Sequence, residues 1–195
     1  MIERGVSFRL GRPSCIDEDD IGIDFPKSPG PPGLIHLRYV AKLGVLQGRI
    51  YHKLYSAKSL TKSTLERLQR IGILDDELQH WRDSVPAEIR PGSEIQVYSD
   101  PRHMMPVIMM QFAYFNALTI IHRVSNHHGP WRNKGDDPFD LKSQESGLNP
   151  RVFAGGAICV SAARSVIELL NACSDALDAG DLNVIRFVFS NTSNK

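Results

Sequence analysis

Hydrophobic residues recur along most of this chain at steps of three and four, the spacing that places them on one face of an α-helix. The first clear case runs from Leu34 to about Ser56. Its apolar stripe consists of Tyr39, Leu43, Leu46, Ile50 and Leu54. Basic residues occupy a neighbouring stripe at positions 38, 42, 49 and 53. The pattern predicts an amphipathic helix with one buried face.

A second helix is predicted to begin at Ser63. Glu66 follows three residues later, the pattern in which each side chain bonds the other residue's backbone N–H at a helix start. An apolar face continues to Val85, and Pro86 bars further helix because it restricts the residue before it. Residues 86–103 contain several prolines and are predicted to form a loop.

The segment from Met104 to Ile121 contains no charged residue and is apolar on nearly every side. Its 18 residues reach the lower length for a membrane span. However, Pro106, Gln111 and Asn116 lie inside it, and no comparable segment stands out elsewhere. Because an all-round apolar helix is typical of a buried centre, we predict a core helix and no membrane partner.

The remaining segments complete an all-α prediction. Asn149 and Pro150 are a suitable N-cap and first residue for a third long helix that runs toward Gly180. No strand–helix alternation and no convincing hairpin is present. The predicted order is an extended or loop segment over 1–33, helices over 34–124, a polar loop over 125–148, a helix over 149–180 and a tail over 181–195.

The amino-acid composition of the chain limits the classes of function that it can have. A chain of 195 residues that is 42% hydrophobic can bury a core as one domain. The net charge of +1 gives no overall attraction to nucleic acid or to an anionic membrane. Cys15, Cys159 and Cys173 are too widely spaced for a disulfide framework or a zinc knuckle. A reducing, intracellular compartment is therefore expected.

The acidic stretch over residues 17–24 fits a calcium-binding loop only in part. Asp17, Asp19 and Gly22 fit positions 1, 3 and 6 of an EF-hand loop, but positions 5 and 12 are Ile21 and Ser28. Two necessary ligands are thus missing. The apolar residues at alternate positions instead predict an extended segment lying across the helical body.

No enzyme signature is present. The pair His127–His128 lies near Asp136 and Asp137, but no further ligand follows at a spacing known for zinc. A cysteine nucleophile paired with a histidine has no local signature either. We therefore predict no catalytic, cofactor-binding or metal-binding residue in this chain.

A basic stripe extends from Arg38 to Arg70, with Glu66 as its one acidic residue. It could follow a phosphate backbone, form a solvated surface, or contact the acidic stretch at 17–24. The sequence leaves these three interpretations open. The stripe consists of Arg38, Lys42, Arg49, Lys53, Lys58, Lys62, Arg67 and Arg70.

Several stretches, in this order, resemble the fungal-specific transcription factor domain, the middle homology region of binuclear zinc-cluster regulators. They are ERGVSFRLGRPSCIDEDDIGIDFP, RIYHKLYSA, LDDELQHWRDSVPAEIRP, MMQFAYFNALTIIHR and CVSAARSVIELL. The positions taken as structural residues of the family motif are Gly11, Arg12, Pro13, Asp20, Ile21, Pro26, Tyr55, Trp81, Pro86, His122, Arg123, Cys159, Ala163 and Arg164.

The resemblance implies an irregular multi-helix regulatory body with an extended N-terminal segment. Gly11-Arg12-Pro13 would turn the chain after a helix. The chain would be the later part of a larger α-helical domain, cut at both ends. Its role would be nuclear, in the regulation of RNA polymerase II transcription.

The family contacts DNA through an N-terminal cluster of six closely spaced cysteines, which this chain lacks. The resemblance therefore places zinc and DNA contact in a missing N-terminal module and no cofactor in this chain. For regulation, the resemblance implies protein partners or a small-molecule effector. It also implies a possible homodimer of the full-length form.

Two further hypotheses remain open. One is a stand-alone all-α protein of enzymatic or partner-binding function, in which His122 or His127 would act with a cysteine. The other is direct DNA binding through the basic stripe.

Overall fold

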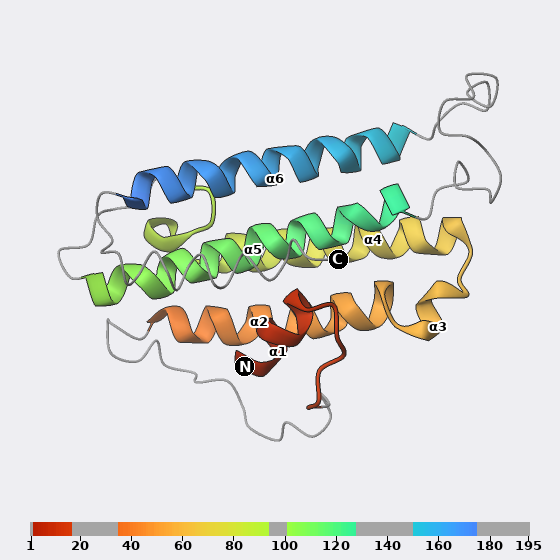
Figure 1. Cartoon of the computed structure of the whole chain (residues 1–195), viewed down its shortest axis with the longest axis horizontal. Helices are drawn as coiled ribbons and strands as arrows, with labels where there is room; N and C mark the ends of the chain where they lie inside the picture. Colours follow the sequence, from red (N-terminus) through yellow and green to blue (C-terminus); the bar gives the residue numbers. More distant parts are fainter. Residues whose placement is uncertain (1, 17–34, 94–100, 128–149, 175–195) are drawn as a thin grey trace.

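The computed structural model describes residues 2–16, 35–93, 101–127 and 150–174 (Figure 1). These ranges contain helices and no strand, which confirms the all-α prediction. The elements are α1 (Ile2–Arg9), α2 (Ile35–Leu54), α3 (Ala57–Leu60), α4 (Thr64–Ser84), the 3-10 helix η2 (Ala87–Ile89), α5 (Pro101–His127) and α6 (Pro150–Ser174).

Helix α2 follows its sequence pattern closely, whereas the apolar face predicted for α4 is buried only in part: Leu78 and Trp81 are buried, but Leu65 is 65% exposed. On α2, Leu43, Ile50 and Leu54 of the predicted stripe are almost completely buried. At the start of α4, the Ser63 hydroxyl accepts a bond from the Glu66 backbone N–H, and the Glu66 carboxylate accepts one from the Ser63 backbone N–H. Such a cap contributes about 1 kcal/mol to helix stability.

Helix α5 is the central element of the described structure. It packs against α2, α4 and α6, and Figure 1 shows it between α2 and α6. Ile108, Ala117 and Ile121 are completely buried. The prediction of a core helix is thus confirmed.

The helix extends further than predicted at both ends. It begins at Pro101, so the end of the predicted loop at 86–103 is helical, and it ends at His127, inside the predicted polar loop at 125–148. Proline is tolerated in the first helical turn because the backbone N–H groups there have no partner within the helix. Nothing between His122 and His127 breaks a helix, and the next glycine is Gly129.

Helix α1 is the main departure from the extended or loop segment predicted over 1–33. An isolated helix of this length is marginal in water, so its formation depends on packing that a local pattern does not reveal. Phe8 and Arg4 are buried where α1 packs on α2. The acidic stretch at 17–24 and the tail at 181–195 lie outside the described residues.

The turn expected at Gly11-Arg12-Pro13 lies directly after α1. Gly11 has a φ of 64°, a conformation that costs other residues energy. The Gly11 N–H donates to the Phe8 carbonyl at 3.1 Å, and the Arg12 N–H donates to the Ser7 carbonyl at 2.8 Å. This pair of bonds is a Schellman helix end.

Two helices contain stretches that are long and apolar enough to cross a membrane, judged by length and composition: Met104–Val124 and Phe153–Ala172. The sequence pattern had singled out the first alone. In α5 the stretch is 61% buried within the protein, as expected of a core helix, whereas in α6 it is only 17% buried. Helix α6 lies along α5, its main neighbour, at one side of the described structure (Figure 1).

Candidate functional site

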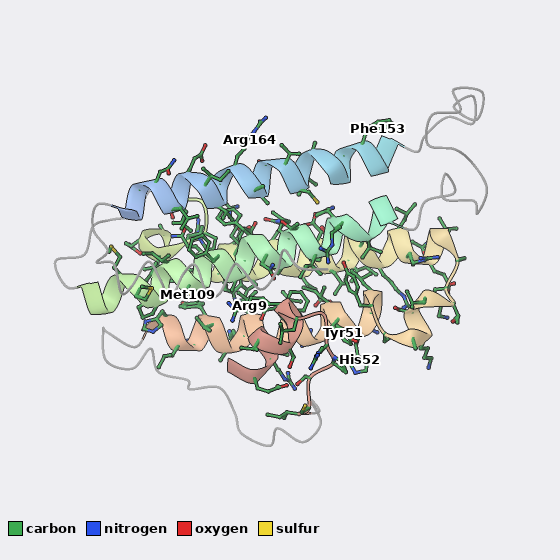
Figure 2. The ribbon with its side chains drawn as sticks, in the orientation of Figure 1. Arg9, Tyr51, His52, Met109, Phe153 and Arg164 are labelled. Carbon is green, nitrogen blue, oxygen red and sulfur yellow. The ribbon has the colours of Figure 1, made fainter. Side chains whose placement is uncertain are left out.

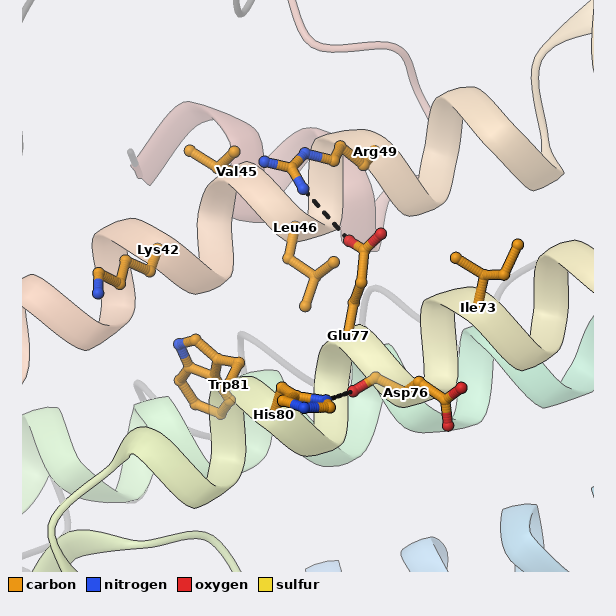
Figure 3. A pocket seen from close by; sticks show the side chains of 9 residues that line it. All are labelled: Lys42, Val45, Leu46, Arg49, Ile73, Asp76, Glu77, His80 and Trp81. Carbon is orange, nitrogen blue, oxygen red and sulfur yellow. Dashed lines mark hydrogen bonds and ion pairs between the residues drawn. The ribbon is translucent and has the colours of Figure 1, made fainter.

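An open groove of about 520 Å³ lies between α2 and α4 (Figure 3). Leu46 and Trp81 are buried at its base, and charged side chains occupy its edges. Mostly apolar lining with a few polar groups is typical of sites for small molecules. The lining residues are Lys42, Val45, Leu46, Arg49, Ile73, Asp76, Glu77, His80 and Trp81.

An ion pair spans this groove. Arg49 Nη1 lies 3.2 Å from Glu77 Oε2, and the two side chains are 48% and 39% exposed. An exposed pair of this kind contributes about 0–1 kcal/mol, so a ligand could separate it at little cost. Farther along α4, His80 Nδ1 donates to the Asp76 carbonyl at 2.9 Å (Figure 3).

Trp81 connects the groove to the core. Its indole Nε1–H donates to the backbone carbonyl of Tyr39 on α2 at 3.0 Å. Its ring stacks on Tyr114 of α5, with ring centroids 6.0 Å apart. One side chain therefore holds α2, α4 and α5 in register and forms the base of the groove.

A second cluster joins α5 to the segment after α2 and to α6. The Tyr55 hydroxyl donates to the Ile120 carbonyl at 2.6 Å. Burial raises the pKa of Tyr55, and the nearby Arg123 guanidinium opposes this in part. On α6, the Cys159 thiol lies 3.6 Å from the Thr119 carbonyl, and burial raises the pKa of that thiol. A thiol in this environment is protonated at neutral pH and is a poor nucleophile.

His122 links α5 to α4. Its Nε2 lies 3.4 Å from Asp75 Oδ1, and the histidine side chain is buried. The His122 ring beside the Asp75 carboxyl lowers the pKa of that carboxyl, and a hydrogen bond from the Gln79 side chain adds to this effect. The pair fixes the position of two packed helices.

The other residues of the family motif lie apart from these clusters. Pro86 directly follows Val85, which is the C-terminal cap residue of α4. Asp20, Ile21 and Pro26 lie outside the described residues. Exposed positions are occupied by Gly11, Arg12, Pro13, Ala163 and Arg164.

No metal site is evident in the described part of the chain. Within it, no three His, Cys, Asp or Glu side chains gather closely enough to hold an ion. The described residues therefore do not fit a zinc cluster. The side chains of His127, His128, Asp136 and Asp137 lie outside the described residues.

Part of the basic stripe is engaged within the protein. Besides the Arg49–Glu77 pair, Lys62 Nζ lies 3.3 Å from Glu66 Oε1. Arg70 Nη1 donates to the Lys53 carbonyl at 3.1 Å. Three of the eight basic side chains of the stripe thus contact groups within the protein.

Sequence reasoning missed Asp75, Glu77 and the groove itself. The sequence signal for these residues was a mostly polar run on α4, DDELQH, next to the apolar face. Such a run does not reveal which members face α2 and which face α5, because that depends on how the helices cross.

The chain was compared with known proteins. No family model matches it, and no solved structure matches it. It is 34% identical over 182 residues to the ABC-transporter-regulating transcription factors of Aspergillus fumigatus and Aspergillus oryzae, covering 87% of this chain and 20% of each regulator. It is 26% identical over 189 residues to an uncharacterized transcriptional regulatory protein of Schizosaccharomyces pombe, covering 25% of that protein.

The chain thus spans about a fifth of the length of the first two curated relatives. These relatives are named as transcription factors and not as enzymes. Over most of its length, this chain is similar to part of fungal transcriptional regulators.

Proposed function

We propose that this chain is the regulatory, non-DNA-contacting region of a fungal transcription factor. The observation that carries the proposal is the 34% identity to two such regulators over 87% of the chain. The all-α architecture of the described residues agrees with it. The protein acts in the nucleus, on transcription by RNA polymerase II.

DNA contact and zinc belong, in this proposal, to a cysteine-rich module outside this stretch. Of the chain's three cysteines, Cys15 is exposed and Cys159 half-buried, and neither has a second cysteine close by in sequence. The choice of target genes would then be made by that other module.

The groove between α2 and α4 is the proposed place for a small-molecule effector. Its size and its mostly apolar lining suit a small, largely apolar compound. Ile73 on its edge is exposed, so a charge placed there should not disturb folding. If a compound raises the melting temperature of the chain, the Ile73→Glu variant should lose that shift while keeping its own melting temperature. An unchanged shift in the variant would place the compound elsewhere.

A reporter assay tests the proposed function. The chain is inserted between an unrelated DNA-binding domain and an activating segment in a fungal reporter strain. We expect the inserted chain to change reporter output several-fold. The matched control carries Leu78→Asp, which places a charge at a completely buried position and prevents folding. Equal output from the intact chain, the control and the fusion lacking the chain would contradict the proposal.

The alternative function is that of an enzyme that uses Cys159 with His122 or His127. Burial raises the pKa of the Cys159 thiol, which disfavours the thiolate that such chemistry needs. If the combined Cys159→Ala and His127→Ala changes abolished an enzymatic turnover of this chain, that result would support the enzyme alternative.

A further inference from the structure

The groove between α2 and α4 has a cation at one end and apolar side chains along its length. Lys42 lies at the same end as Trp81, and Ile73 lies at the opposite end (Figure 3). Lys42 and Arg49 are seven residues apart on α2, so about 10 Å of helix separates the two cations. Leu46 lies between them and is buried at the base of the groove. The groove is therefore an apolar trough with a positive charge at one end.

The ammonium group of Lys42 has no anionic partner within the described part of the chain. No hydrogen bond or ion pair joins it to another described residue, although Lys42 is half-buried. Arg49, in contrast, is paired with Glu77 at 3.2 Å. A half-buried cation beside apolar side chains has lost part of its hydration, so an anion that binds there replaces the lost contacts with water.

The acidic side chains of the groove do not compensate this charge. The Glu77 carboxylate is engaged with Arg49. Asp76 is exposed, and Figure 3 shows its carboxylate directed away from Lys42 and Trp81. The uncompensated charge beside the apolar base is therefore positive.

We propose that the groove selects a small organic anion with an apolar body, of the class of alkyl carboxylates. The carboxylate pairs with Lys42, and the apolar body lies over Leu46 and Trp81 toward Ile73. This inference rests on the proposed function, in which the groove holds the effector, and it adds the sign of the effector's charge. The groove of about 520 Å³ is within the range of about 300–1,000 Å³ that is typical of sites for small molecules.

The outward side of α6 provides an internal comparison. Figure 2 shows Phe153 and Arg164 on the side of α6 that faces away from α5. Phe153 is 63% exposed, and Arg164 is exposed as well. This surface also places a cation beside an apolar side chain, but it is the convex side of a single helix. Because an amphiphile that only adsorbs to apolar surface would bind there too, Arg164 supplies the matched control for Lys42.

A nuclear magnetic resonance titration tests the proposal. The isotope-labelled chain is titrated separately with octanoate, octanol and octylammonium, which share one alkyl chain and differ in charge. The Kd of each compound is measured, together with the backbone amides whose signals shift. The titrations are repeated with Lys42→Gln, which removes the charge, with Lys42→Arg, which keeps it, and with the Arg164→Gln control.

We expect octanoate to bind about tenfold more tightly than octanol and octylammonium, with the shifted amides on α2 and α4. Lys42→Gln should bring the Kd of octanoate close to that of octanol, because it removes the interaction that distinguishes the two compounds. Lys42→Arg and Arg164→Gln should both keep the tighter binding of octanoate.

Several results would overturn the proposal. They are the absence of octanoate binding, equal Kd values for the three compounds, and tighter binding of octylammonium. Loss of octanoate binding in Arg164→Gln, or amide shifts confined to α6, would also overturn it, because the compound would then be adsorbed on the outward side of α6. The comparison of the three compounds uses the unmodified chain, so it decides the question even if Lys42→Gln does not fold.

The reporter assay separates this inference from the proposed function. Selective octanoate binding in the groove together with an unchanged reporter output would support the inference while the proposed function fails. A changed reporter output without octanoate binding would overturn the inference while the proposed function stands.

Discussion

Trp81 joins three helices through a single side chain. Its indole donates to Tyr39 on α2, stacks on Tyr114 of α5 and forms the base of the groove. Its apolar character and place on α4 were visible in the sequence. Its hydrogen-bond partner was not, because a backbone carbonyl on another helix carries no local sequence signal.

Replacing Trp81 should therefore destabilise the protein strongly. The Trp81→Ala variant loses the stacking, the hydrogen bond and much buried area, and we expect a loss of about 3–5 kcal/mol in the free energy of unfolding. Urea unfolding followed by circular dichroism measures this. Trp81→Phe should lose clearly less, because it keeps an aromatic ring at the site. Equal stability of Trp81→Ala and the wild type would show that the ring is not a packing centre.

The Asp75–His122 pair should make the free energy of unfolding depend on pH in the acidic range. The neighbouring His122 ring lowers the pKa of Asp75 below its value in the unfolded chain, about 3.8. The stabilisation is thus complete above that pH and is lost as the pH falls through the lowered folded-state pKa. We expect the stability difference between wild type and Asp75→Asn to be largest above about pH 5 and to shrink below about pH 4.

Unfolding free energies at pH 3 to 6 check this prediction. Asp76→Asn, at the exposed neighbouring position, is the matched control and should show a much smaller pH-dependent difference. A difference for Asp75→Asn that stays constant over this range would mean that the pair does not couple to folding.

At the scale of elements, the long amphipathic helices were predictable and the short one was not. Helix α2 repeats an apolar stripe over five turns, and α4 is marked by its cap at Ser63 and by Pro86 after its last residues. Helix α1 depends on packing against α2 and on contacts from the turn that follows it. The Glu3 carboxylate accepts bonds from the Ser14 hydroxyl at 2.8 Å and the Cys15 N–H at 2.9 Å, and no periodic pattern encodes them.

Two glycine substitutions should have opposite effects. Gly11 ends α1 with a φ of 64°, so Gly11→Ala should lower stability by about 1–2 kcal/mol. Gly72 lies inside α4 with open space where a methyl group would stand, so Gly72→Ala should raise stability by up to about 1 kcal/mol. Amide hydrogen exchange of α1 and thermal melting of both variants measure the effects. A stabilising Gly11→Ala would contradict the helix end described for α1.

At the scale of the whole molecule, and among the described residues, α5 packs against α2, α4 and α6, whereas α6 packs chiefly against α5. The sequence showed that both are helices, but it did not show which would be central. Periodicity reports the apolar face of a helix and not the number of neighbours it has. The groove was unpredictable for a related reason, since it is formed between α2 and α4, and which of their side chains face each other depends on how the two helices cross.

The chain should not bind DNA by itself. Its net charge is +1, and several cations of the basic stripe already contact groups within the protein. We expect no mobility shift of duplex DNA below about 10 µM protein at 150 mM salt, a concentration in the middle of the range of dissociation constants for non-specific binding. A salt-dependent shift that disappears in a Lys53→Glu, Lys58→Glu variant would instead assign DNA contact to the stripe.

The central claim is that this chain regulates transcription without reading DNA. The most direct measurement is the sequence of the complete transcript 5′ of the codon for Met1. The account predicts an in-frame segment that encodes two closely spaced Cys-x2-Cys pairs and a basic linker. A stop codon directly upstream, with translation starting at Met1, would contradict it.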